Sequence, residues 1–133
     1  DSKYRTVADN RHRAMAGLSM GGGQSWTIGL KHPEVFSNIG IFSSGMFGGV
    51  SYAPFDLQKE CPELLADPQA FNDNLDVFYI SCGETDPRIE PTKAAVELMR
   101  SNGAEIHFTA FPGGHEWQPW RKSLHEFVQL LFK

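Results

Sequence analysis

A serine between glycines is the strongest chemical feature of this sequence. Residues 17–21, Gly-Leu-Ser-Met-Gly, form a G-x-S-x-G motif between a predicted strand at 13–17 and a predicted helix at 20–31. In such a strand–turn–helix the serine hydroxyl is exposed, the serine backbone is strained, and close packing requires glycine on both sides. The sequence therefore predicts that Ser19 is a nucleophile and that the Met20 backbone N–H, at the start of the helix, donates to an oxyanion.

A serine hydroxyl is a weak nucleophile at neutral pH, so it needs a histidine that accepts its proton. His115 lies in the segment 112–117, Pro-Gly-Gly-His-Glu-Trp, which follows a predicted strand and precedes a predicted helix. The glycines of this segment permit an exposed imidazole, so His115 is predicted to be the base. The other histidines are assigned to the surface or to packing, namely His12, His32, His107 and His125.

Asp86 is the carboxylate that we assign to this histidine. It lies in the turn 81–87, just past the end of a predicted strand, where the catalytic groups of open parallel sheets gather. Two alternatives stay open: Glu84 and Glu90 are neighbouring carboxylates, and Asp86 could instead cap a helix predicted to begin near residue 91. The chain order Ser, Asp, His is the order of the α/β-hydrolase fold.

Short apolar runs alternate with helical segments, which favours a parallel sheet flanked by helices. The predicted strands are 13–17, 39–43, 77–81 and 106–110, and the predicted helices are 20–31, 91–102 and a final amphipathic segment at 120–131. Gly103 is predicted to end the middle helix. Residues 45–75 are rich in Gly, Pro and aromatic residues and are predicted to be a loop that shapes specificity.

Composition limits the classes of partner. The 133 residues, 41% hydrophobic, suffice for one packed core. The net charge is -4 and the cationic residues are scattered, so we expect no nucleic-acid partner, and no apolar run is long enough to cross a membrane. Cys61 and Cys82 have neither metal-ligand spacing nor the density of a disulfide scaffold, and we predict unpaired structural cysteines and no metal site.

Several segments resemble the enterochelin-esterase-like, or esterase D, family, which includes feruloyl and acetylxylan esterases. The likeness spans essentially the whole chain and is carried by residues 13–24, 31–36, 64–68, 79–86 and 113–117 with Trp120. The resemblance implies an α/β-hydrolase fold and ester hydrolysis by acyl transfer through Ser19, His115 and Asp86, with no metal or organic cofactor.

The resemblance also implies that the family's domain extends upstream of the serine. Residues 1–133 would then be the C-terminal catalytic part of one esterase domain, with the first strands and the second oxyanion N–H in the absent N-terminal half. Removing an oxyanion donor costs about 10²- to 10³-fold in turnover. We therefore expect the isolated chain to need that half for full activity, and its open sheet edge to associate with it or with another copy.

The substrate is argued mainly from the resemblance, which favours feruloyl or acetyl esters of plant cell-wall xylan and a secreted or periplasmic enzyme. The candidate substrate-binding aromatic residues, each of which could equally belong to the core, are Trp117, Trp120 and Phe47, with Tyr52 and Phe55 as further candidates. Two enzyme alternatives stay open, a siderophore (enterochelin-type) esterase and an S-formylglutathione-type thioesterase. A non-enzyme alternative is a catalytically dead carbohydrate-binding module, against which the ordered Ser, Asp and His argue.

Overall fold

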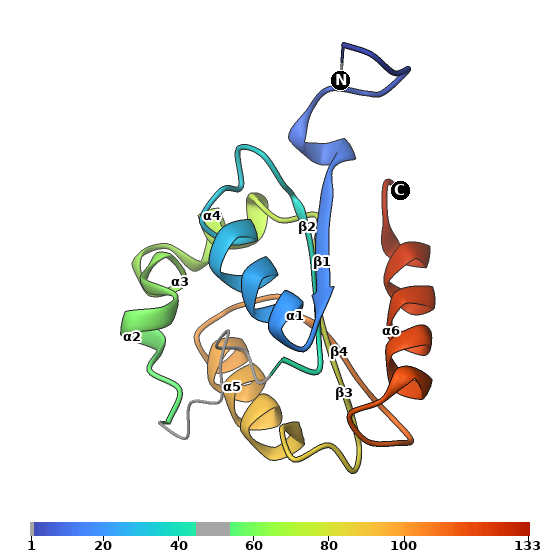
Figure 1. Cartoon of the computed structure of the whole chain (residues 1–133). Helices are drawn as coiled ribbons and strands as arrows, with labels where there is room; N and C mark the ends of the chain where they lie inside the picture. Colours follow the sequence, from blue (N-terminus) through green and yellow to red (C-terminus); the bar gives the residue numbers. More distant parts are fainter. Residues whose placement is uncertain (1, 45–53) are drawn as a thin grey trace.

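Four parallel strands form the centre of the molecule (Figure 1). The computed structural model describes residues 2–44 and 54–133. The strands are β1 (Ala14–Leu18), β2 (Asn38–Phe42), β3 (Val77–Gly83) and β4 (His107–Phe111), and they lie in the order β1-β2-β3-β4. Every neighbouring pair is parallel. The predicted parallel sheet is therefore confirmed, with strand bounds within two residues of those expected.

The strand register places the carboxyl ends of the strands, which precede the predicted site residues, side by side. Leu18 at the end of β1 lies beside Phe42, and Phe42 lies beside Ser81 of β3. Gly83 at the end of β3 lies beside Phe111 at the end of β4. The turns that follow β1, β3 and β4 therefore all leave the sheet on the same side.

Helices cover the two faces of the sheet unequally (Figure 1). One face carries α1 (Met20–Gln24), the π-helical turn η2 (Ser25–Gly29), α2 (Leu57–Glu60), α3 (Pro62–Ala66), α4 (Pro68–Asp73) and α5 (Ile89–Ser101), and the other carries α6 (Trp117–Leu130). A short 3₁₀ turn, η1 (Asn10–His12), precedes β1. None of these helices is long and apolar enough to cross a membrane, a finding that covers the described residues only.

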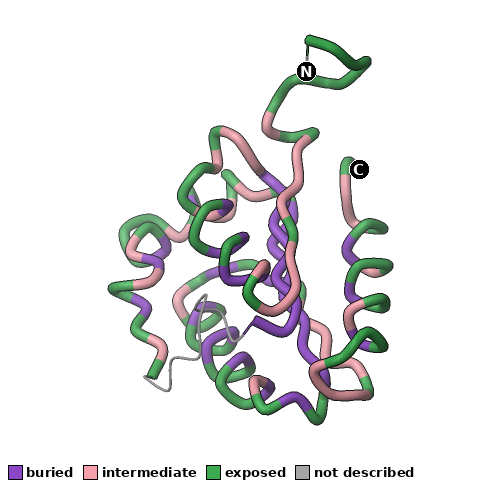
Figure 2. Tube along the Cα trace, viewed as in Figure 1, coloured by how far each residue is buried: buried purple, intermediate pink, exposed green. Residues whose placement is uncertain are grey.

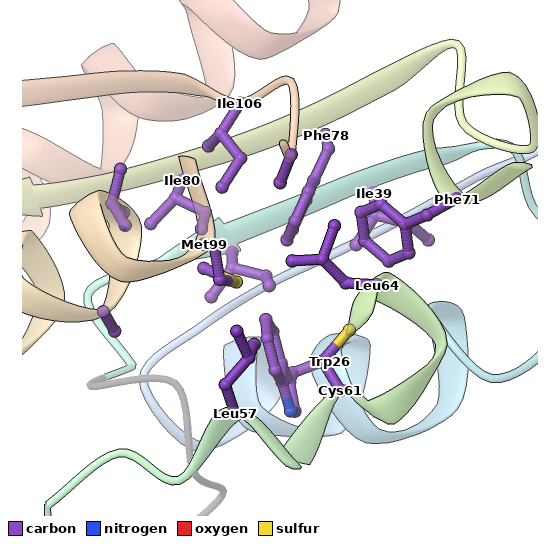
Figure 3. Close-up of a cluster of buried hydrophobic side chains, with 14 residues drawn as sticks. Trp26, Ile39, Leu57, Cys61, Leu64, Phe71, Phe78, Ile80, Met99 and Ile106 are labelled. Atoms are coloured by element: carbon purple, nitrogen blue, oxygen red, sulfur yellow. The ribbon is translucent and has the colours of Figure 1, made fainter. Parts of the chain in front are cut away.

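The main core lies between the sheet and the helices of the more heavily covered face (Figures 2 and 3). Strand β2 is buried at every position, as is expected for an inner strand of a parallel sheet covered on both faces. The buried side chains that Figure 3 labels come from strands and helices alike: Trp26, Ile39, Leu57, Cys61, Leu64, Phe71, Phe78, Ile80, Met99 and Ile106.

The prediction of a loop over residues 45–75 is wrong for its second half. Residues 57–73 form α2, α3 and α4, each only four to six residues long and so too short to show a helical period. Their start signals are clear in the structure, because Pro62 and Pro68 occupy first helical positions and the Asp67 side chain accepts a hydrogen bond from the Ala70 N–H. Residues 45–53 lie outside the described residues.

The helix predicted over 20–31 is shorter than expected and is not α-helical throughout. Helix α1 ends at Gln24 and continues as the π-helical turn η2, in which the Ser25 hydroxyl donates to the Gly21 carbonyl at 3.0 Å. The other helix predictions are confirmed with small changes in bounds, and Gly103 follows α5 with a φ of 99°.

Both cysteines are free and buried, which confirms that they are unpaired. Burial raises the pKa of the Cys61 thiol to about 11, and burial together with the Asp86 charge raises that of Cys82 to about 11. Both therefore stay neutral near pH 7 and serve as small apolar side chains of the core.

Helix α6 is held to the sheet by one aromatic side chain and by polar contacts on the same face. Phe127, 2% exposed, contacts the rings of Phe42 and Tyr79 at centroid distances of 5.8 and 5.7 Å. The Tyr79 hydroxyl, whose pKa is raised by burial and by Glu126, donates to the Glu126 carboxylate at 2.9 Å. The buried Ser81 hydroxyl donates to Ser123 at 2.7 Å.

We expect Phe127→Ala to lower the free energy of unfolding by about 3–5 kcal/mol, because it leaves a cavity between α6 and the sheet. Leu124 lies on the same helix but is 52% exposed, so Leu124→Ala should cost no more than about 0.5 kcal/mol. Urea denaturation followed by circular dichroism measures both. Equal losses in the two variants would contradict the packing described for α6.

Candidate active site

Ser19 lies in the turn between β1 and α1 with a strained backbone. Its φ is 52° and its ψ is -120°, a conformation that residues other than glycine rarely adopt. The Ser19 N–H donates to the Phe42 carbonyl at 2.8 Å, which ties the turn to the end of β2. The strain expected at Ser19 is therefore present.

The glycines around Ser19 differ in the space that each position leaves for a side chain. A Cβ on Gly17 would lie 2.2 Å from the Gly21 carbonyl carbon, so a side chain cannot be accommodated there. A Cβ on Gly22 would lie 2.7 Å from the Ser44 Cβ, whereas a Cβ on Gly21 meets no atom of the described residues within 4 Å. The expectation of a required glycine on both sides of the serine is thus correct before it, but after it the close approach occurs at Gly22 rather than Gly21.

Met20 is the first residue of α1, directly after Ser19. The first N–H groups of a helix have no acceptor within the helix, and they carry the positive end of the helix dipole. The Ser19 carbonyl accepts the N–H groups of Gly22 and Gly23 at 3.0 and 3.3 Å, so the helix begins immediately at the serine. Met20 itself is 68% exposed.

His115 lies between β4 and α6 and connects the other two predicted residues. Its Nε2 lies 2.9 Å from the Ser19 Oγ, and its Nδ1 lies 2.7 Å from the Asp86 Oδ2. Because an ionised carboxylate only accepts hydrogen bonds, we assign the proton to Nδ1, which leaves Nε2 to accept from the serine hydroxyl. The structure thus brings Ser19, His115 and Asp86 into one hydrogen-bonded chain.

The Asp86 carboxylate is fully buried and each of its oxygens has a separate partner. Oδ2 faces His115, while Oδ1 accepts from the Arg88 backbone N–H at 2.9 Å. The alternative role as a helix cap is not present, because α5 begins at Ile89 after the N-cap residue Arg88 with no side-chain cap hydrogen bond, and the bond from the Arg88 N–H lies in the turn before it. Glu84 and Glu90 are exposed and do not join the chain, and Glu90 lies 3.6 Å from Lys93 on the surface of α5.

The turn that carries Asp86 and the loop that carries His115 are in backbone contact, a feature that sequence analysis missed. The Glu84 N–H donates to the Phe111 carbonyl at 2.8 Å, and the Thr85 N–H donates to the Gly113 carbonyl at 3.0 Å. A Cβ on Gly83 would lie 2.4 Å from the carbonyl oxygens of the loop, so glycine permits this approach. The loop is also closed on itself, because the Gly114 N–H donates to the Glu116 carboxylate at 3.0 Å.

Two tryptophans extend from the histidine towards solvent. The Trp120 ring lies edge-on to His115 at a centroid distance of 5.0 Å, and Trp117 lies 5.4 Å from Trp120. Trp120 is half-buried and Trp117 is 68% exposed. Trp117 is therefore available to a ligand, whereas Trp120 packs against the imidazole.

Of the remaining aromatic candidates, only Phe55 is among the described residues. Phe47 and Tyr52 lie outside the described residues. Phe55 packs against the buried Trp26 at a centroid distance of 5.9 Å, which supports a core role for it.

The other histidines lie at the surface, as expected. His12 contacts Asp9 and His32 contacts Glu34, and in each pair the hydrogen bond from histidine lowers the pKa of the carboxyl. His107 and His125 are also exposed. Among the described residues, no group of three or more His, Cys, Asp or Glu side chains could hold a metal ion.

Comparisons with known proteins point to one family. The family model described as "Putative esterase" matches residues 1–131. The endo-1,4-β-xylanase/feruloyl esterase of Xylanibacter ruminicola is 32% identical over 134 residues, which are 100% of this chain and 16% of that protein. An acetyl esterase of Caldicellulosiruptor saccharolyticus is 21% identical over 143 residues, covering 90% of this chain and 54% of that protein.

A solved ferulic acid esterase has the same fold, with a TM-score of 0.75 and 25% identity over 98% of this chain and 56% of that one. The predicted α/β-hydrolase fold and the resemblance to esterases are therefore confirmed. The chain spans less than two thirds of the length of each of these three relatives.

The two glycines after Ser19 provide a matched test of the turn. We expect Gly22→Ala to cost about 1–3 kcal/mol of stability, because its methyl group would lie 2.7 Å from the Ser44 Cβ. Gly21→Ala meets no described atom and gains about 1 kcal/mol of helix propensity. Calorimetry should show a lower Tm for Gly22→Ala and an unchanged or higher Tm for Gly21→Ala, and the reverse order would contradict the packing of this turn.

Proposed function

The chain belongs to the esterase family, and from that premise we propose that it forms the catalytic part of a serine carboxylic-ester hydrolase. Ser19 is the nucleophile, His115 the base and Asp86 the acid. The observation that supports these roles most strongly is the pair of contacts through the imidazole, 2.9 Å to the Ser19 Oγ and 2.7 Å to the Asp86 Oδ2. Both distances are within the range of good hydrogen bonds.

Acylation follows from this arrangement. His115 Nε2 removes the proton of Ser19 as Oγ attacks the ester carbonyl carbon, and the carbonyl oxygen becomes an oxyanion. The Met20 N–H and the N-terminal end of α1 stabilise that negative charge. The tetrahedral intermediate then collapses, the alcohol leaves with the proton held by His115, and an acyl-serine remains.

Deacylation repeats the same proton transfers with water. His115 removes a proton from a water molecule, which attacks the acyl carbon, and the second intermediate releases the carboxylic acid and returns the proton to Ser19 Oγ. Throughout both halves the buried Asp86 carboxylate holds the Nδ1–H, which keeps Nε2 directed at the reacting oxygen.

The proposed substrates are feruloyl or acetyl esters of plant cell-wall xylan. The names of a 32% identical relative and of a solved structure that shares the fold include feruloyl or ferulic acid esterase, and that of a second relative is acetyl esterase. The exposed Trp117 ring, next to Trp120 and His115, is a suitable surface for stacking a flat phenolic acyl group. Stacking on Trp117 would favour the feruloyl ester, which carries an aromatic ring, over the acetyl ester.

The sheet edge at β1 supports a proposed partner. Among the described residues, β1 pairs with β2 alone, so the other edge of β1 presents backbone N–H and C=O groups. Ala16, in the middle of this strand, is exposed. We propose that this edge takes up a further strand from the rest of the esterase domain, because an exposed parallel edge is satisfied by β-strand addition.

A fluorophosphonate probe tests the nucleophile and this partner together. We expect one covalent adduct by intact mass on the full-length protein and no adduct on its Ser19→Ala variant, because only an activated serine reacts. Labelling of the full-length protein but not of residues 1–133 alone would support the need for a completed β1 edge. Absence of any adduct on the full-length protein would overturn the esterase proposal and favour a non-catalytic binding module.

Substrate choice is tested at Trp117. We expect Trp117→Ala to lower kcat/KM for methyl ferulate roughly 3- to 10-fold, because a well-placed aromatic pair contributes about 0.5–1.5 kcal/mol. Trp117→Phe should retain most of the rate, and kcat/KM for p-nitrophenyl acetate should change little in either variant. Equal losses on both esters would exclude a stacking role, and hydrolysis of thioesters or siderophore esters alone would favour the alternative substrate classes.

A further inference from the structure

The Asp86 carboxylate poses an electrostatic problem that His115 does not solve. Its side chain is 0% exposed, and an ionised carboxylate without water needs compensating charge or several hydrogen bonds. While the imidazole is neutral it supplies one hydrogen bond to Oδ2 and no charge. The second oxygen, Oδ1, must therefore be stabilised from elsewhere.

Arg88 meets both needs at Oδ1. Its backbone N–H donates to Oδ1 at 2.9 Å and its guanidinium Nη1 donates to the same oxygen at 3.3 Å. No other lysine or arginine of the described residues forms an ion pair with Asp86. The Arg88 side chain is 32% exposed, so the guanidinium keeps contact with water while it neutralises the buried oxygen.

We propose that Arg88 is a positioning residue for catalysis, whose guanidinium holds the Asp86 carboxylate in the orientation that directs Oδ2 at His115. The inference rests on the proposed roles of Ser19, His115 and Asp86. The guanidinium binds the oxygen that His115 does not use, so it restrains rotation of the carboxylate without competing for the imidazole.

This role is separable from the formation of the turn. The Arg88 backbone N–H bonds Oδ1 whatever side chain is present, and the Ile89 N–H donates to the Asp86 carbonyl at 3.0 Å. Replacing the side chain by glutamine therefore removes the cation and leaves the backbone contacts that shape the turn. A loss of kcat that requires the Asp86 carboxylate and is partly restored by lysine is what positioning predicts and what a purely structural role does not.

The test measures kcat and KM for p-nitrophenyl acetate and Tm in the full-length protein. We expect Arg88→Gln to lower kcat about 10-fold, the effect of one charge-assisted hydrogen bond, with KM within about 2-fold. The Tm should fall by a few degrees, because the variant leaves a buried carboxylate without its cation, so kcat is compared at a temperature at which both proteins are folded. Arg88→Lys, which keeps the charge, should recover part of kcat. Lys93→Gln, which removes an exposed cation from α5, should leave kcat unchanged.

A double-mutant cycle shows whether Arg88 acts through Asp86. Asp86→Asn removes the carboxylate charge, so Arg88→Gln should change kcat by less than about 2-fold in that background. The same 10-fold loss in both backgrounds, or no loss in the native background, would overturn the proposal. An active protein whose Ser19→Ala variant is also active would instead overturn the triad, so the two failures are distinguishable.

Discussion

The parallel register of the strands is the constraint on which the site depends. Ser19 and His115 are 96 positions apart, yet they meet because the carboxyl ends of the parallel strands β1 and β4 lie on the same side of the sheet. In an antiparallel sheet, successive strands run in opposite directions, so the turns that follow them would alternate between the two ends of the strands. Register alone does not bring side chains within hydrogen-bond distance, however. The final approach depends on backbone contacts between turns. Gly83 lets the turn that carries Asp86 contact the carbonyl oxygens of the loop that carries His115, the histidine loop.

The strained serine is stabilised by the structure around it. A positive φ at a residue other than glycine costs on the order of 1–3 kcal/mol, and it persists only where neighbours over-determine the conformation. Here the Ser19 N–H is fixed by β2, the Ser19 carbonyl accepts two N–H groups of α1, and Gly22 packs against Ser44. On the opposite side of the sheet, Phe127 and the Ser81–Ser123 contact fix α6, and α6 in turn fixes the end of the histidine loop. The same buried contacts therefore stabilise the fold and position the reactive groups.

The sheet was predictable because its strands are short apolar runs. The residues of the candidate site were predictable because each lies in the turn that follows one of these strands. What could not be predicted involves contacts between segments far apart in the sequence. The packing of Gly22 against Ser44 and of Gly83 against the histidine loop leaves no local pattern beyond the glycine itself. Helices α2 to α4 were missed for another reason, since segments this short are recognised only by their capping aspartates and prolines. The guanidinium contact of Arg88 depends on a side-chain conformation that sequence does not specify.

Exposure to solvent decreases along the hydrogen-bonded chain of the site. From Ser19, which is partly exposed, the hydrogen-bonded chain passes to His115, 27% exposed, and ends at a carboxylate that is 0% exposed. Coulomb interactions strengthen as water is excluded. The burial of Asp86 therefore strengthens its attraction to a protonated His115, and this attraction orients the base. A charge that deep needs hydrogen bonds or a nearby cation, and a fully buried cation would add its own desolvation cost. Arg88 avoids that cost because its partly exposed guanidinium stays hydrated while one nitrogen contacts the carboxylate.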